Sequence, residues 1–237
     1  MFFTIFWAVF FISIKLIALI ILPVLYVLKV LLPKRNYHRI VYECASFWGR
    51  LVVQSTGSKL QISGMENIPD CRTLCIIANH QSFLDIPVLL GWLRIPLGFI
   101  AKMELLKVPV ISHWMKELNC VFINRKNARS AMTSFNESAE TIKSGNPIVI
   151  FPEGTRSKSP KMGQFHTGSL KLAYIAKASI LPVSINGTYR IWEENYRIRK
   201  SIVKLTIHPV ISPEDQIYQN KELLQEHLFN IIRSAND

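Results

Sequence analysis

One histidine and one aspartate lie close together in the sequence, directly after an apolar segment. Residues 73–78 form a short, continuous and partly β-branched run, which predicts a buried strand. His80 follows this run, and Asp85 comes five positions later. A neutral imidazole accepts a proton near physiological pH, and a carboxylate on its other ring nitrogen fixes the tautomer and stabilises the imidazolium. For an isolated histidine and aspartate at this spacing, a polar turn with Ser82 or Asn79 as helix cap is the simpler interpretation.

Two basic residues also stand where predicted strands end. Arg125 follows the apolar run 120–123, and Lys102 follows a strand predicted at 97–101. A guanidinium at a strand end can bind phosphate through forked, charge-assisted hydrogen bonds, and an ammonium group adds positive charge. Taken alone, Arg125 is more simply a surface residue at the start of a loop, and a solvated side chain is an equal alternative for Lys102.

A third polar turn follows the apolar run 148–151. Residues 152–157 read P-E-G-T-R-S, and proline cannot continue a central strand. Gly154 permits a tight turn and the close approach of a ligand to the backbone, while Glu153 and Arg156 place opposite charges beside it. The segment is similar to an anion cradle without the glycine spacing of a P-loop. The alternative is a plain β-turn whose exposed ion pair contributes little stability.

A fourth apolar run covers residues 180–186 and leads to Gly187 and Thr188. Pro182 lies inside the run, and proline within a strand predicts a sheet edge or a bulge. The run is a candidate wall of a binding site, but core packing is its simpler role.

The elements that must position these residues alternate between strands and helices from residue 58 onward. This pattern predicts an α/β fold with a mixed, largely parallel central sheet flanked by helices. In such sheets, ligands gather at the carboxyl ends of the strands, where the polar turns stand. The predicted strands are 59–63, 73–78, 97–101, 120–124, 147–151, 180–186 and 202–208. The predicted helices are 83–93, 108–118, 128–144, 168–177 and 220–233.

Residues 1–57 are predicted to form a membrane-associated segment of two helices, ahead of an α/β domain at 58–237. The first 32 residues are almost wholly apolar and long enough to span a bilayer. Lys15 divides this stretch, however, and Pro23 would kink a helix. The sequence allows one spanning helix or a helix that enters one leaflet, with a slight preference for insertion without a clean span.

Residues 36–56 predict an amphipathic helix whose apolar face includes Phe47 and Trp48. This helix could pack on the domain or lie at the membrane interface, and the sequence favours neither. Lys34 and Arg35 come directly before it. By the positive-inside rule, the chain beyond these basic residues is predicted to be cytoplasmic.

The composition is both apolar and basic: 49% of residues are hydrophobic, 19% are charged, and the net charge is +12. This combination favours a membrane surface with anionic lipid as the partner. Nucleic acid is disfavoured because no zinc-finger spacing or RNP-like stretch occurs. The four cysteines lack the paired spacing of a zinc site, which predicts reduced, mostly buried thiols in a cytosol-facing domain and no metal site.

Taken together, the four blocks resemble the glycerolipid acyltransferase family. The hallmark N-H-x-S-x-x-D is present at residues 79–85, and the block F-P-E-G-T-R-S is complete at residues 151–157. The resemblance runs from about residue 60 to about Thr188. Three departures occur. Asn119-Cys120 stand where the family often has glycine before the second block's strand, and that block ends in Asn124-Arg125, where the family commonly has Asp-Arg. His166 stands where a basic residue often follows phenylalanine.

Within the family, the chain looks most like the enzymes that acylate 1-acylglycerol-3-phosphate. The resemblance implies transfer of a fatty acyl group from acyl-CoA or acyl carrier protein to the sn-2 hydroxyl of lysophosphatidic acid, which gives phosphatidic acid for phospholipid biosynthesis. His80 would act as general base and Asp85 would orient it. Arg125 and Arg156 would hold the phosphate of the acceptor, and Lys102 would add positive charge.

The resemblance assigns the remaining residues of the third block to positioning. Glu153 would position Arg156 or a glycerol hydroxyl, and backbone N–H groups near Gly154 or Thr155 would stabilise the oxyanion. No metal or redox cofactor is required. Two alternatives stay open: another lysolipid acceptor, such as lysophosphatidylglycerol or a lyso-aminolipid, and a non-catalytic membrane protein that binds anionic lipid.

Overall fold

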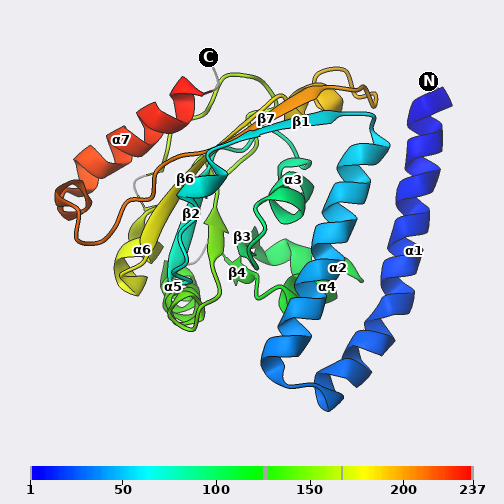
Figure 1. Cartoon of the computed structure of the whole chain (residues 1–237), viewed down its shortest axis with the longest axis horizontal. Helices are drawn as coiled ribbons and strands as arrows, with labels where there is room; N and C mark the ends of the chain where they lie inside the picture. Colours follow the sequence, from blue (N-terminus) through cyan, green and yellow to red (C-terminus); the bar gives the residue numbers. More distant parts are fainter. Residues whose placement is uncertain (1, 125–127, 167, 236–237) are drawn as a thin grey trace.

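The computed structural model describes residues 2–124, 128–166 and 168–235, and its centre is a seven-stranded sheet (Figure 1). The strand order is β1-β7-β6-β2-β5-β3-β4. β6 and β7 pair antiparallel, and the other neighbouring strands pair parallel, which confirms the predicted mixed, largely parallel sheet. The strands are β1 (Lys59–Ser63), β2 (Leu74–Ala78), β3 (Gly98–Lys102), β4 (Val121–Ile123), β5 (Ile148–Ile150), β6 (Ser179–Asn186) and β7 (Ile202–Ile207).

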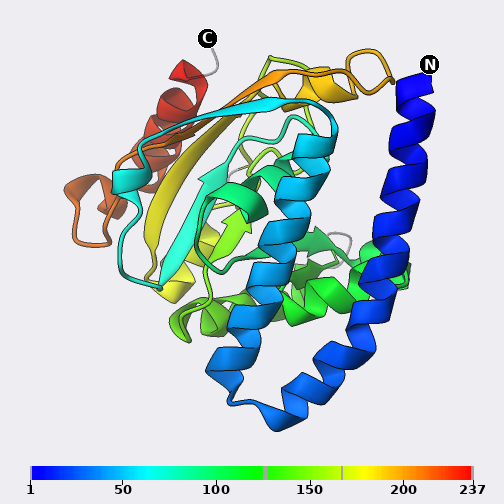
Figure 2. The same ribbon diagram turned by 45° about the vertical axis from the view of Figure 1, so that its right-hand side comes forward.

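Helices cover both faces of this sheet. α2 and α3 lie on one face, with α1 outside them, and α5, α6 and α7 lie on the other (Figures 1 and 2). The predicted helix at 108–118 is shorter than expected, because it begins only after Val110, whose φ of 65° is not helical. The helices are α1 (Phe2–Leu31), α2 (Lys34–Ser55), α3 (Asp85–Trp92), α4 (Ile111–Glu117), α5 (Ala128–Lys143), α6 (Lys171–Ala176) and α7 (Lys221–Ser234).

The central strand β2 is buried along its whole length. Leu74, Ile76 and Ala78 belong to the core under α2 and α3, whereas Cys75 and Ile77 belong to the core under α5, α6 and α7. Successive side chains of a strand point to opposite faces, so a strand covered on both faces is apolar throughout. The uninterrupted apolar run before His80 is the sequence signature of this position.

Pro182 lies in the interior strand β6, so of the two predicted alternatives, an edge or a bulge, the structure has the bulge. β6 pairs with β2 on one side and with β7 on the other. On the β7 side, Ile180 pairs with Ile211 and Val183 pairs with Ile207. Two residues lie between Ile180 and Val183, whereas three lie between Ile207 and Ile211. The extra residue forms a bulge beside Pro182. At a bulge the regular pairing is interrupted, so the proline, which has no N–H, is not required to donate a hydrogen bond there.

α2 packs closely on α3. Packing on the domain was one of the two alternatives predicted for this helix. Its buried face is rotated from the predicted stripe, and Phe47, expected on the apolar face, is exposed. Gly49 is buried instead, and a Cβ built on it would lie 2.5 Å from the Pro87 carbonyl oxygen. The absence of a side chain at Gly49 therefore allows the two helix backbones to approach each other.

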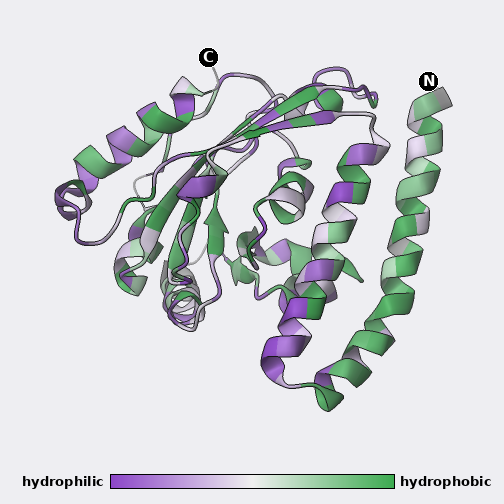
Figure 3. Ribbon diagram, viewed as in Figure 1, coloured by the Kyte–Doolittle hydropathy of each residue, from purple (hydrophilic) through white to green (hydrophobic). Residues whose placement is uncertain are grey.

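α1 is one continuous helix that includes Pro23, and it is long and apolar enough to cross a membrane. It runs along the outer side of α2, and Figure 3 shows it almost uniformly hydrophobic. Its outward residues, such as Ile20 and Val30, are exposed. An exposed surface this apolar indicates membrane association. The division of the chain near residue 57 stays a prediction.

α1 is also attached to the rest of the molecule by polar contacts along its length. The Trp7 indole N–H donates to Ser55 Oγ at 3.0 Å, and the Trp114 indole N–H donates to the Ala18 carbonyl at 3.3 Å. At the other end of the helix, Lys29 Nζ lies 2.8 Å from Glu117 Oε1. These contacts hold α1 beside α2 and α4.

Candidate active site

The polar turns that follow the apolar runs meet at one edge of the sheet. β2, β3, β4, β5 and β6 are mutually parallel, so their carboxyl ends point the same way. Polar side chains that follow these strands are thereby brought together from distant parts of the sequence. The residues at these ends are His80 after β2, Lys102 at the end of β3, Asn124 after β4, Phe151 after β5 and Gly187 after β6.

His80 and Asp85 form a hydrogen-bonded pair at the end of β2. His80 Nδ1 lies 2.7 Å from Asp85 Oδ2. Because an ionised carboxylate only accepts hydrogen bonds, Nδ1 carries the proton and Nε2 has the lone pair of the ring. The histidine side chain is 16% exposed, whereas the aspartate is fully buried. The geometry is that of a base held by a carboxylate partner.

Asp85 receives a full set of donors that keep its charge in place. Oδ2 accepts from the backbone N–H groups of Gln81 and Ser82, at 2.7 and 2.9 Å, in addition to the imidazole. Oδ1 accepts from Thr188 Oγ1 at 2.6 Å. A buried carboxylate is tolerated when its lone pairs are filled in this way. The turn from β2 into α3 is therefore built around Asp85.

Thr188 is a site residue that sequence reasoning missed. The sequence indicates it only as the end of a possible wall, because 103 residues separate it from Asp85. It lies just beyond the end of β6, and β6 is a parallel neighbour of β2. That position beside the polar turn of β2 was the signal that could have identified it.

Glu153, expected to position Arg156 or a glycerol hydroxyl, is hydrogen-bonded to the backbone of His80. Its carboxylate accepts from the backbone N–H of His80 at 2.6 Å and from that of Gly163 at 2.6 Å. Burial raises the pKa of this carboxyl, and the two backbone hydrogen bonds act in the opposite direction. Glu153 therefore ties the 151–157 block to the backbone of the histidine.

The carboxylate that pairs with Arg156 is that of Glu193. Arg156 Nη1 lies 3.3 Å from Glu193 Oε1, and the other carboxylate oxygen accepts from Ser82 Oγ at 2.6 Å. The Phe83 backbone N–H also donates to Oε1 at 3.1 Å. Sequence reasoning missed Glu193, which is a buried acidic residue in a strongly basic stretch of the chain.

The 151–157 block also contacts the histidine through its aromatic ring and its backbone. The Phe151 ring stacks on the imidazole, with centroids 4.0 Å apart and planes inclined by 14°. The backbone N–H of Ser157 donates to the His80 carbonyl at 2.8 Å. The imidazole is thus supported on one face and held at its backbone, so its orientation is restricted before any substrate binds.

The remaining predicted site residues differ in how the structure places them. Gly154 has φ of 67°, the left-handed conformation that the tight turn requires, and Thr155 beside it is exposed. Lys102 is exposed at the carboxyl end of β3, paired in register with Ile123 of β4. Arg125 lies outside the described residues.

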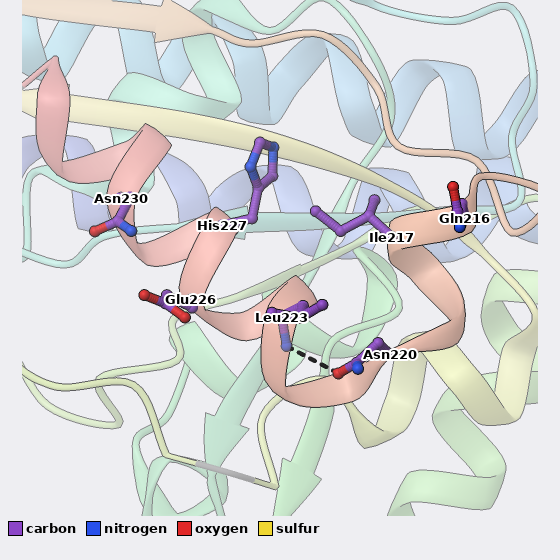
Figure 4. A pocket seen from close by; sticks show the side chains of 7 residues that line it. All are labelled: Gln216, Ile217, Asn220, Leu223, Glu226, His227 and Asn230. Atoms are coloured by element: carbon purple, nitrogen blue, oxygen red, sulfur yellow. Dashed lines mark hydrogen bonds between the residues drawn. The ribbon is translucent and has the colours of Figure 1, made fainter.

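A surface hollow along α7 shares no lining residue with this site. Figure 4 shows its lining, which comes from residues 216–230 in α7 and the short helix before it. The Leu223 backbone N–H donates to Asn220 Oδ1 there, an ordinary helix cap. α7 covers the sheet face opposite to α3 (Figure 1), whereas His80 follows the carboxyl end of β2.

The arrangement at the sheet edge can activate a hydroxyl group. A neutral imidazole whose Nδ1–H is held by a buried carboxylate can take a proton at Nε2. Within the described part of the chain, no group of three or more His, Cys, Asp or Glu side chains is arranged to hold a metal ion. The fold and the site define an α/β protein in which a histidine, held by a buried carboxylate, lies at the carboxyl ends of parallel strands.

Comparison with known proteins gives the family. A model of the acyltransferase family matches residues 59–186, which is more than half of the chain. The chain is 37% identical over 201 residues to a probable 1-acyl-sn-glycerol-3-phosphate acyltransferase of Mycoplasma genitalium, covering 83% of this chain and 71% of that protein. It is 30% identical over 178 residues to the 1-acyl-sn-glycerol-3-phosphate acyltransferase of Borreliella burgdorferi, covering 75% and 70%.

A solved structure is similar over nearly the whole chain. It is the crystal structure of the 1-acyl-sn-glycerophosphate acyltransferase PlsC from Thermotoga maritima, with a TM-score of 0.79 at 28% identity. The similarity covers 95% of this chain and 94% of that one. The chain belongs to the acyltransferase family.

Proposed function

We propose that this enzyme transfers a fatty acyl group from an acyl thioester to the sn-2 hydroxyl of lysophosphatidic acid, which yields phosphatidic acid. The observation that carries the proposal is the 2.7 Å contact between His80 Nδ1 and Asp85 Oδ2 at the carboxyl edge of the sheet. The similarity to proteins named as acyltransferases of 1-acyl-sn-glycerol-3-phosphate supports this acceptor.

In the proposed reaction, His80 Nε2 takes the proton of the acceptor hydroxyl as its oxygen attacks the thioester carbonyl. The tetrahedral intermediate then collapses with cleavage of the carbon–sulfur bond, and the imidazolium returns its proton to the leaving thiolate. Asp85 stays ionised and stabilises the imidazolium. Because the hydroxyl attacks directly, no covalent acyl-enzyme is formed.

Arg156 and Arg125 are the proposed ligands of the acceptor's phosphate, and Lys102 is proposed to add positive charge. The partial exposure of the Arg156 side chain, 38%, supports a role in which it meets a ligand. Backbone N–H groups near Gly154 or Thr155 are proposed to stabilise the oxyanion. The contact of Glu153 with the His80 backbone supports a positioning role for that carboxylate.

Membrane association gives the enzyme access to a substrate and a product that reside in the bilayer. Moving an acyl chain through water costs about 0.8 kcal/mol per CH₂, so an active site at the interface avoids that barrier. We propose that the α/β domain lies on the cytoplasmic side, where acyl-CoA or acyl carrier protein supplies the acyl group.

A comparison of acceptors tests the proposal. Purified protein in detergent is given acyl-CoA or acyl carrier protein with lysophosphatidic acid, lysophosphatidylglycerol or 1-monoacylglycerol at matched concentrations. We expect the highest kcat/KM with lysophosphatidic acid, because a phosphomonoester carries the charge that arginine recognises best. Preference for another acceptor would replace the proposed substrate, and no turnover with any of them would leave a lipid-binding protein without activity.

A further inference from the structure

Glu193 is a buried carboxylate that connects the two blocks of the site. Its side chain is 2% exposed and lies shortly after the end of β6, 111 residues from Ser82 in the sequence. It accepts hydrogen bonds from Ser82 Oγ and from the Phe83 backbone N–H, both in the turn that carries His80. Its third contact is the guanidinium of Arg156.

Burying a carboxylate is unfavourable in free energy, so the groups that contact the Glu193 carboxylate must offset that cost. Removing an ionised group from water is unfavourable unless other groups replace the lost hydration. The Ser82 and Phe83 donors replace part of that hydration and are supplied by neutral groups. The Arg156 contact adds an opposite charge, and it is made by a side chain that reaches out toward solvent.

We propose that Glu193 is a positioning residue for acceptor binding: it holds the Arg156 guanidinium by Nη1, so that the remaining N–H groups are directed to the acceptor's phosphate. This inference rests on the proposed function. Arginine has about 2 kcal/mol of side-chain entropy, and a guanidinium anchored at one nitrogen loses less of it on binding a ligand. Glu193 is also hydrogen-bonded to the turn that carries His80. The proposed phosphate site is therefore held at a fixed position relative to the base.

Glu193→Gln separates the positioning role from a purely structural one. The glutamine oxygen can still accept from the Phe83 N–H, and its amide nitrogen can still bond to Ser82 Oγ. The negative charge is lost, which leaves Arg156 only a neutral hydrogen bond to that oxygen in place of the ion pair. Glu194→Gln is the matched control, because it makes the same charge change at the next residue, which is exposed. Both variants are compared with the wild type by thermal unfolding, to establish equal folding.

We expect Glu193→Gln to raise the KM for lysophosphatidic acid about two- to fivefold, the size of one partly exposed ion pair, with kcat changed by less than about twofold. Glu194→Gln is expected to keep both constants. In an Arg156→Ala background, Glu193→Gln is expected to have no further effect on KM, because the residue through which it acts is gone.

The results that would overturn the inference are distinct from those that overturn the function. If the wild type acylates lysophosphatidic acid and Arg156→Ala raises KM, an unchanged KM in Glu193→Gln contradicts the positioning role. The same holds if Glu193→Gln lowers kcat alone, or raises KM equally in the Arg156→Ala background. If the wild type does not turn over lysophosphatidic acid, the proposed function fails and the inference fails with it.

Discussion

At the scale of single residues, the site is organised around the buried carboxylate of Asp85. Three backbone or side-chain donors besides the imidazole fill its lone pairs: Gln81 N, Ser82 N and Thr188 Oγ1. A carboxylate held this way does not need to move to support a charged imidazolium, which is the preorganisation that makes electrostatic stabilisation effective. The position of the Asp85 carboxylate therefore depends on these donors, just as the position of the His80 imidazole depends on Asp85.

Thr188→Val tests this dependence, because valine has the same shape and lacks the hydroxyl donor. We expect kcat to fall about tenfold with little change in KM, since one hydrogen bond to a charged group is lost. Thr188→Ser retains the donor and is expected to stay close to wild type. A Thr188→Val enzyme with wild-type kcat, or a Thr188→Ser enzyme that is equally slow, would show that this hydrogen bond does not support the base.

The residues of the site were predictable from the sequence only where they are close together in it. His80 and Asp85 are separated by five positions after an apolar run, and that local spacing is visible without a structure. Thr188 and Glu193 approach them from more than a hundred residues away, and their contacts depend on which strands are neighbours. The resemblance gave Glu153 two possible roles, to position Arg156 or a glycerol hydroxyl. In the structure Glu153 accepts from the backbone of His80 and Gly163, and Arg156 pairs with Glu193.

At the scale of elements, the position of α3 depends on its contact with α2. Asp85 is the first residue of α3, so a shift of this helix moves the partner of the histidine. The two helices approach closely at Gly49, where an added Cβ would lie 2.5 Å from the Pro87 carbonyl oxygen. Overpacking at such a contact forces the helices apart.

Gly49→Ala is expected to lower the free energy of unfolding by about 1–3 kcal/mol, the usual range for an overpacked contact. Thermal or urea unfolding of the protein in detergent measures the effect. Gly168→Ala is the control, because no heavy atom lies within 4 Å of the Cβ built there. Equal stability of the two variants would show that α2 and α3 are not in tight contact at Gly49.

Most elements were predictable, because hydrophobic periodicity and glycine or proline boundaries are local signals. The seven predicted strands are present with bounds shifted by at most a residue or two. The face of α2 was predicted less well, because its contact with α3 uses Gly49 and leaves Phe47 outside. Hydrophobic spacing favours large side chains and gives no weight to a glycine at a close helix contact.

At the scale of the whole molecule, α1 is the element suited to membrane association. Its outer surface is apolar, and its inner surface is attached to Ser55 of α2 and to Trp114 and Glu117 of α4. The apolar character of this helix was evident from the sequence. Its attachment along the α/β domain was not, because such contacts depend on the three-dimensional arrangement.

Ile20→Glu is predicted to weaken membrane binding. Ile20 is 70% exposed on α1, and placing a charge in a lipid-facing position is unfavourable by more than about 2 kcal/mol. We expect at least about thirtyfold weaker partitioning into phosphatidylcholine vesicles in a flotation assay, by conversion of that energy. Ile202→Glu, at an exposed isoleucine of β7, is the control and is expected to bind as the wild type does. Equal loss in both variants, or in neither, would contradict lipid contact through α1.

The rate of acyl transfer after removal of the proposed base is the sharpest check of the mechanism. Purified His80→Ala is compared with the wild type and with His113→Ala, which removes an exposed histidine from α4. With an acyl thioester and lysophosphatidic acid, we predict that kcat falls by about 10²–10⁴ in His80→Ala, the usual contribution of a general base, and is unchanged in His113→Ala. If His80→Ala retains a kcat close to that of the wild type, another group activates the hydroxyl and the proposed role of His80 is wrong.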